Sequence, residues 1–258
     1  MIVITGPGRS GTSLLARLYQ ELGFDPVEGG GGWEESIRGG LEDVEVGRLN
    51  LEIIRALKMQ GRSSPLADRA KRFLDRRPPG GGTGAAAEDR APRAPSLGLA
   101  ALQRTIGRRI RLQSWDDLAP VTERFGEQLR ELAARRVVVK DPQFCQTLAV
   151  WAAAKAPIEQ VVISLRETTA TAQGLLELGH LPGWARASAP NHVAYRVGLL
   201  MTAVVDHRLP HVVVRFPDFL HEAGSLYDSL RFPAPVDRER FLEVFAALVN
   251  PGLVHNWR

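Results

Sequence analysis

Short runs of branched apolar residues recur along the chain, and these runs predict buried β-strands. Four of them show no alternation of polar and apolar positions: Ile2–Thr5, Val137–Val139, Val161–Leu165 and Val212–Val214. A strand without such alternation is typical of a parallel sheet that helices cover on both faces.

Longer stretches with apolar residues three or four positions apart lie between these runs and predict helices. The first, Thr12–Leu22, places its leucines on one side of the helix. The others are Leu49–Leu57, Leu118–Leu132, Leu148–Ala156, Val193–Val205 and Phe241–Val249. Strands that alternate with helices predict an α/β fold, a three-layer sandwich around a central parallel sheet.

The segment Pro78–Pro95 interrupts this pattern because it contains no aromatic or branched aliphatic residue. Such a composition cannot bury a core, so we expect a mobile loop. Helical patterns flank it at Leu66–Leu74 and Leu97–Ile110. We therefore expect a single domain spanning residues 1–258, with a helical and flexible insertion at about 61–115.

Composition and charge exclude several classes of protein. The formal net charge is +4, and the segment Arg62–Ser96 alone holds eight basic and four acidic residues. The rest of the chain is balanced, so no nucleic-acid-binding face is expected. The single cysteine, Cys145, excludes an intramolecular disulfide. No apolar run reaches about 18 residues and no secretory signal is recognisable, so we expect a cytoplasmic protein without membrane partners.

The main chemical signal is a glycine-rich turn that joins the first strand to the first helix. It reads Gly6-Pro7-Gly8-Arg9-Ser10-Gly11-Thr12-Ser13. Backbone N–H groups of such a turn and of the helix N-terminus form a cradle for an anion. The spacing matches the phosphate-binding P-loop, except that Thr12 stands where a kinase or ATPase has its lysine. Arg9 is the cation that the turn itself supplies.

The stretch Arg9-Ser10-Gly11-Thr12-Ser13-Leu14-Leu15 resembles the 5′-phosphosulfate loop of sulfotransferases that use 3′-phosphoadenosine 5′-phosphosulfate (PAPS). The likeness is closer to the bacterial and Golgi protein-tyrosine branch than to the cytosolic aryl sulfotransferases. Further stretches resemble the same family in the same order: Gly40-Leu41-Glu42-Asp43 followed by Leu49-Asn50, Val138–Gln143 followed by Trp151, Val162–Arg166 and Val213–Leu220.

The resemblance implies a P-loop-containing sandwich that transfers a sulfuryl group from PAPS to a hydroxyl of a small-molecule acceptor, without a metal. It implies donor binding by Gly8, Arg9, Ser10, Gly11, Thr12 and Ser13, with Arg9 also stabilising the leaving phosphate. Arg166 corresponds to the arginine that binds the 3′-phosphate. Family members have a proline two residues and a serine eight residues after that arginine, where this chain has Thr168 and Gly174. The hydroxyls of Thr168, Thr169 and Thr171 are candidate replacements, and Gln143 stands where the family has an arginine.

The acceptor hydroxyl needs a general base, and none of the six histidines lies in a comparable motif. Carboxylates are therefore the better candidates. Glu42 and Asp43 come first, although carboxylates at the start of a helix are also good caps. Glu34 and Glu35, beside Trp33, come second. Lys140 and Asp141 close a strand, where they belong either to the site or to a structural ion pair.

Two other classes stay open. A nucleotide or metabolite kinase with a degenerate P-loop would lack its lysine, and Asp141 is the only candidate carboxylate for Mg²⁺ after a strand. A non-catalytic nucleotide-binding protein of the same fold would fit the departures at Thr168 and Gly174. The sulfotransferase is the leading interpretation.

Overall fold

The computed structural model describes residues 1–25, 33–35, 41–60, 115–181 and 183–249. In this part of the chain, four strands form a parallel sheet in the order β4-β1-β5-β6. The strands are β1 Ile2–Thr5, β4 Val138–Lys140, β5 Gln160–Leu165 and β6 His211–Arg215. The four apolar runs predicted as strands are therefore confirmed as strands, with every end within one residue. The expected burial on both faces is wrong for β6, the last strand in this order, where Val213 is 46% exposed.

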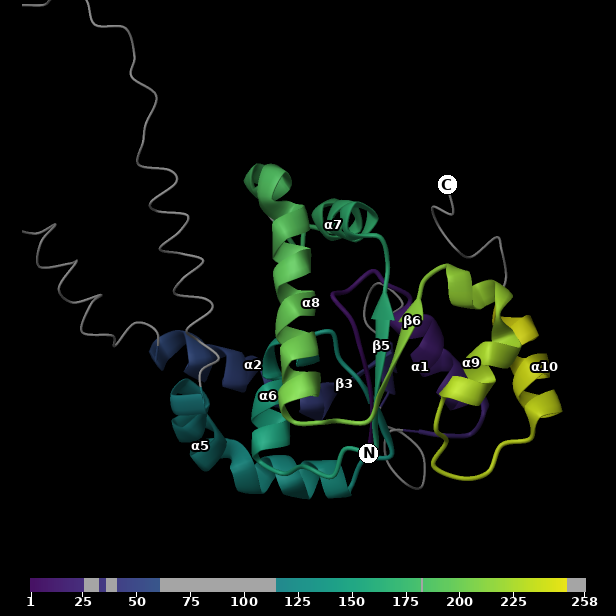
Figure 1. Ribbon diagram of the computed structural model, residues 1–258, viewed down its shortest axis with the longest axis horizontal. Coiled ribbons are helices and arrows are strands. Elements are labelled where there is room, and N and C mark those ends of the chain that lie inside the picture. The colour runs from purple at the N-terminus through teal and green to yellow at the C-terminus, as the bar shows by residue number, and fades with distance from the viewer. Residues whose placement is uncertain (26–32, 36–40, 61–114, 182, 250–258) are drawn as a thin grey trace, which may run out of the picture.

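Helices cover both faces of this sheet, as Figure 1 shows. Successive residues of β1 belong to different cores, Ile2 and Ile4 to one and Val3 to the other. One face carries α1 Thr12–Glu21, α9 Ala223–Ser229 and α10 Arg238–Leu248. The opposite face carries α2 Val44–Gln60, α5 Trp115–Ala134, α6 Phe144–Ala153 and α8 Ala189–Asp206. This arrangement is compatible with the predicted three-layer sandwich.

The carboxyl ends of the strands meet at one edge of the sheet. Ile4 of β1 lies opposite Lys140 of β4 on one side and opposite Val162 of β5 on the other. The helix α7 Thr168–Glu177 follows β5 at this edge and packs against α8. In Figure 1, α7 lies beyond the tip of β5. Short 3₁₀ turns, η1 Gly183–Ser188 and η2 Asp218–His221, precede α8 and α9.

Some helix boundaries differ from the prediction. The α2 helix starts at Val44 rather than Leu49, because Asp43 caps it by accepting from the N–H of Val46 at 2.9 Å. The predicted helix Leu148–Ala156 starts earlier, at Phe144. The α7 helix was not predicted, since its threonine-rich start lacks apolar periodicity. Its N-terminus is instead fixed by the carboxylate of Glu167, which accepts from two backbone N–H groups.

A small antiparallel sheet, also unpredicted, precedes α2. Its strands are β2 Trp33–Glu35 and β3 Leu41–Asp43. Glu42 and Asp43 therefore lie at the end of β3, and α2 begins directly after them.

Other expectations fall on parts of the chain that the structure does not describe. The predicted insertion at about 61–115, with Pro78–Pro95, Leu66–Leu74 and Leu97–Ile110, lies outside the described residues, except for Trp115. Within the described ranges, no helix combines the length and the apolar character that crossing a membrane requires.

Candidate functional site

The glycine-rich turn after β1 adopts a conformation that favours anion binding. Gly8, Arg9 and Gly11 have φ angles of 89°, 55° and 88°. Ser10, between Arg9 and Gly11, is not left-handed, and a change of hand between successive residues directs their backbone N–H groups to the same side of a turn. Gly11 is the N-cap of α1, no side chain caps this helix, and its first turn holds no acidic residue. The free N–H groups of α1 therefore extend the cradle.

Residues at the ends of β5 and β6 contact the turn and fix its position. A Cβ atom on Gly6 would overlap the carbonyl oxygen of Ser164, so only glycine fits there. The hydroxyl of Ser164 donates to the carbonyl of Ser10. A Cβ atom on Gly11 would lie 2.6 Å from Cδ2 of Phe216, the residue that follows β6. These contacts explain why the turn needs glycines at the places where strands approach it.

The α7 helix brings Thr171 and the Arg9 side chain to the same region. A Cβ atom on Gly174 would lie 3.2 Å from Cγ and 3.5 Å from Nε of Arg9. One on Gly8 would lie 3.3 Å from Leu175. Thr171 is buried and shares the helix face of Gly174 and Leu175, which follow it by three and four residues. Gly174, a departure from the sulfotransferase pattern, thus leaves room for Arg9.

Arg166 follows β5, and its guanidinium carbon lies 5.5 Å from the ring centroid of Phe216. A guanidinium over an aromatic face is attracted by the ring, by about 1 kcal/mol at a partly exposed site. Since Phe216 also packs against Gly11, one side chain positions both the N-cap of α1 and Arg166. Two arginines, one exposed and one half-buried, therefore border the cradle.

Buried polar atoms without a partner concentrate around this turn. In the part of the chain that the structure describes, four buried side-chain polar atoms have no hydrogen-bond partner. Three of them surround the turn, and they are Oγ of Ser10, Oγ1 of Thr171 and Nε of Arg196. Each unpaired group of this kind costs about 1–3 kcal/mol, so such a concentration is typical of a site rather than of a core.

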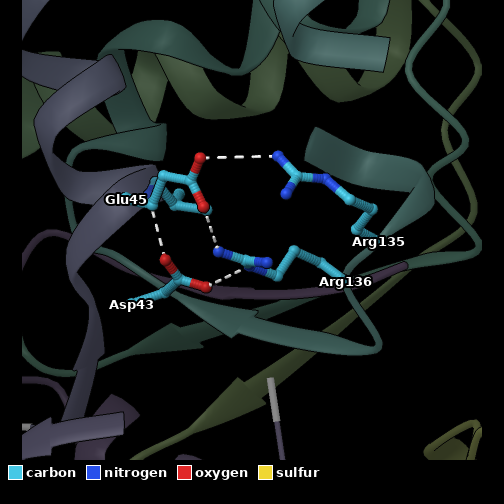
Figure 2. A network of polar contacts seen from close by, with 5 residues as sticks. Asp43, Glu45, Arg135 and Arg136 are labelled. Atoms are coloured by element: carbon cyan, nitrogen blue, oxygen red, sulfur yellow. Dashed lines mark hydrogen bonds and ion pairs between the residues drawn. The ribbon is translucent and has the colours of Figure 1, made fainter. Parts of the chain in front are cut away.

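The carboxylate of Asp43 takes part in contacts that hold the fold together, and Figure 2 shows them. Its side chain is buried, and its Oδ2 accepts from Nε of Arg136 at 2.6 Å. Its Oδ1 caps α2, so both oxygens are engaged. Nη2 of Arg136 also lies 2.6 Å from Oε2 of Glu45, whose other oxygen lies 3.4 Å from Arg135. The cap considered for Asp43 in the sequence is present, and this carboxylate joins β3 and α2 to the segment before β4.

Glu42 differs from its neighbour because its side chain is 44% exposed. Its Oε1 lies 3.1 Å from Nζ of the buried Lys140. Lys140 is opposite Ile4, two residues before Gly6, so the pair lies at the same sheet edge as the turn. The lysine thus pairs with Glu42, in place of the Lys140–Asp141 pair considered from the sequence. Of Glu34 and Glu35, the structure describes only the backbone, in β2.

Asp141 belongs to a buried network rather than to an open site. Its Oδ2 accepts from Nδ2 of Asn50 at 2.8 Å, and its Oδ1 accepts from the N–H of Gln143 at 2.8 Å. Oδ1 of Asn50 in turn accepts from Thr147 and from Nε1 of Trp151. Burial is the main cause that raises the pKa of Asp141 to about 6, against the lowering effect of the Asn50 hydrogen bond.

Sequence reasoning missed Arg196, since a lone arginine in a predicted helix carries no motif. The residue lies on α8, and Nη2 donates to the carbonyl of Pro142 at 2.7 Å while Nη1 donates to that of Pro7 at 3.3 Å. It thereby connects the turns after β4 and β1. Among the described residues, no group of three or more His, Cys, Asp or Glu side chains could hold a metal ion.

Comparisons of the chain with family models, with curated proteins and with solved structures gave no match.

Proposed function

We propose that the protein is a sulfotransferase of P-loop type, which transfers a sulfuryl group from PAPS to a hydroxyl of a small-molecule acceptor. The observation that carries this proposal is the turn from Gly6 to Gly11. It has three left-handed residues, an uncapped helix behind it and an arginine within it. Together with the residues of the sequence that resemble sulfotransferases, this cradle favours a phosphosulfate donor.

Two features favour sulfuryl over phosphoryl transfer. Thr12 is buried at the position where a kinase needs its lysine, so Arg9 supplies the cation. Asp141, the candidate Mg²⁺ ligand of a kinase, is buried and has both oxygens occupied by Asn50 and Gln143. A sulfuryl group carries less negative charge than a terminal phosphoryl group, so backbone N–H groups and an arginine are sufficient for it.

Different residues around the turn bind different parts of the donor. The N–H groups of Gly8, Gly11 and the first turn of α1 bind the 5′-phosphate side, with the hydroxyls of Ser10, Thr12 and Ser13 nearby. Arg166, supported by Phe216, binds the 3′-phosphate with its forked guanidinium. Thr171, with its buried and unpartnered hydroxyl, completes this side of the site.

Glu42 is the proposed general base, and Asp43 is not retained for that role because both of its oxygens are engaged. The contact with Lys140 fixes the direction of the Glu42 carboxylate, which receives the proton of the acceptor hydroxyl. PAPS supplies the sulfuryl group and the phosphate leaving group. As the sulfur–oxygen bond to that phosphate breaks, Arg9 and the N–H groups of the turn stabilise the charge on the departing oxygen.

Ligand binding to the purified protein tests the proposal. Adenosine 3′,5′-bisphosphate at 100 times its dissociation constant should add about 2.7 kcal/mol to the free energy of unfolding. ATP with Mg²⁺ and adenosine 5′-phosphate are the matched comparison ligands. With all ligands at the same concentration, a larger stabilisation by ATP with Mg²⁺ would overturn the proposal in favour of a kinase. Binding of the bisphosphate without any transfer from PAPS to phenols or sugar alcohols would favour a non-catalytic nucleotide-binding protein.

A further inference from the structure

Arg196 occupies a place behind the glycine-rich turn that the proposed mechanism does not use. Its two terminal nitrogens reach the carbonyls of Pro7 and Pro142, residues that follow β1 and β4. The α8 helix that carries it packs against α6 and α7, which border the same edge of the sheet. One side chain thus fixes two turns relative to the helical layer.

The contact with Pro7 determines the orientation of the next N–H group. The Pro7–Gly8 peptide is trans, and the carbonyl and the N–H of a trans peptide point in opposite directions. When Arg196 holds the carbonyl, the N–H of Gly8 faces away from Arg196. Gly8 is the first left-handed residue of the turn, so this N–H is the first donor of the cradle.

The charge of Arg196 is not neutralised within the described structure. Its contacts there are carbonyl oxygens, none of its nitrogens is in an ion pair with a carboxylate, and its Nε is buried without a partner. A half-buried cation without a carboxylate is unfavourable unless an anion is close. Within the described residues, the guanidinium is therefore held by its contacts with the two carbonyls.

We propose that Arg196 is a positioning residue of the anion site: its forked contact with the carbonyls of Pro7 and Pro142 orients the N–H of Gly8 toward the bound phosphate. This inference rests on the proposed function only in placing an anionic group at the turn. It extends to any phosphate that binds there, whatever reaction the protein catalyses.

The experiment compares Arg196→Met and Arg196→Lys with wild type, and Arg186→Met is the control because Arg186 is exposed just before α8. Isothermal titration with adenosine 3′,5′-bisphosphate gives the affinities, and thermal unfolding without ligand gives the stabilities. Arg196→Met should bind the bisphosphate about tenfold more weakly and Arg196→Lys about threefold more weakly, since lysine keeps the charge but not the fork. Arg186→Met should bind like wild type.

Affinity of the folded protein is the readout that separates positioning from a merely structural role. If Arg196→Met lowers the melting temperature but binds the bisphosphate like wild type, the inference is overturned. It is also overturned if Arg196→Lys binds as tightly as wild type. If Arg196→Met does not fold, the loss in Arg196→Lys decides.

Failure of the proposed function has a different signature. If wild type binds ATP or inorganic pyrophosphate but not the bisphosphate, the sulfotransferase proposal fails, and the same variants are compared with that anion. A loss of its affinity in Arg196→Met would then still support the inference. If wild type binds none of these anions, both are overturned.

Discussion

The substitutions Asp43→Asn and Glu42→Gln should have different effects: the first should mainly lower stability, and the second should mainly lower catalysis. The two carboxylates are adjacent in sequence and lie in opposite environments. Asp43 is 1% exposed and paired with the guanidinium of Arg136, a residue that is 9% exposed, whereas the Glu42 side chain is 44% exposed. Removal of one partner from a buried ion pair costs about 3–5 kcal/mol.

The structure reduces this cost for Asp43→Asn. Arg136 keeps its contact with Glu45 at 2.6 Å, and the amide oxygen of asparagine can still accept from the N–H of Val46. We therefore expect a loss of about 2–3 kcal/mol in the free energy of unfolding. Glu42→Gln should lose less, about 1–2 kcal/mol, because the partly exposed carboxylate is screened by solvent and the amide oxygen can still accept from the buried Lys140.

Urea unfolding followed by circular dichroism measures both losses, and Glu45→Gln is the control for a partly exposed partner of Arg136. Activity is measured as transfer from PAPS to a phenol or sugar alcohol that wild type accepts. Glu42→Gln should bind adenosine 3′,5′-bisphosphate normally but lose transfer by about 100-fold or more. Folded Asp43→Asn should keep both. The reasoning is refuted if Asp43→Asn is as stable as wild type, or if Glu42→Gln retains transfer.

Three further substitutions test other parts of the site. Arg9→Ala should lower transfer by about 100-fold without changing the melting temperature, since the side chain is exposed, and activity close to wild type would contradict its role. Arg166→Ala should weaken binding of adenosine 3′,5′-bisphosphate far more than that of adenosine 5′-phosphate in calorimetric titrations; equal weakening would exclude a 3′-phosphate contact. Asp141 has its pKa raised to about 6, so the native state holds its proton more tightly than the unfolded chain. The stability of wild type relative to Asp141→Asn should therefore fall by about 2–3 kcal/mol between pH 4 and pH 7, and a pH-independent difference in urea titrations would argue against this.

The sequence predicted the sheet well because a short run of branched apolar residues is visible locally, even in β6, where Val213 is 46% exposed. The run Ile2–Thr5 is apolar on both faces, and the structure buries it in two cores. The first turns of α2 and of α7 were not visible in this way. Each depends on a carboxylate, Asp43 or Glu167, that caps the helix from outside the apolar pattern.

Contacts between distant residues were the least predictable part of the site. Asn50 joins Asp141 and Trp151, which follow it by 91 and 101 positions. The sequence marked Asn50 in one motif and both Asp141 and Trp151 in another, but only the fold shows that the three residues form one buried network. Arg196 was invisible for the same reason, since its partners are backbone carbonyls rather than side chains with a recognisable pattern.

The residues around the site therefore fall into two groups, those that connect elements of the fold and those that hold the glycine-rich turn. Those that face inward, such as Asp43, Asn50 and Asp141, join β3, α2 and α6 to the segments before and after β4. Side chains from four elements contact the turn itself, namely Ser164 of β5, Phe216 after β6, Leu175 of α7 and Arg196 of α8. A cradle that is fixed in advance by its neighbours does not have to be ordered by its ligand, so more of the binding energy is available to stabilise developing charge. On this reasoning, loss of one of these contacts should weaken anion binding even where the residue never touches the anion.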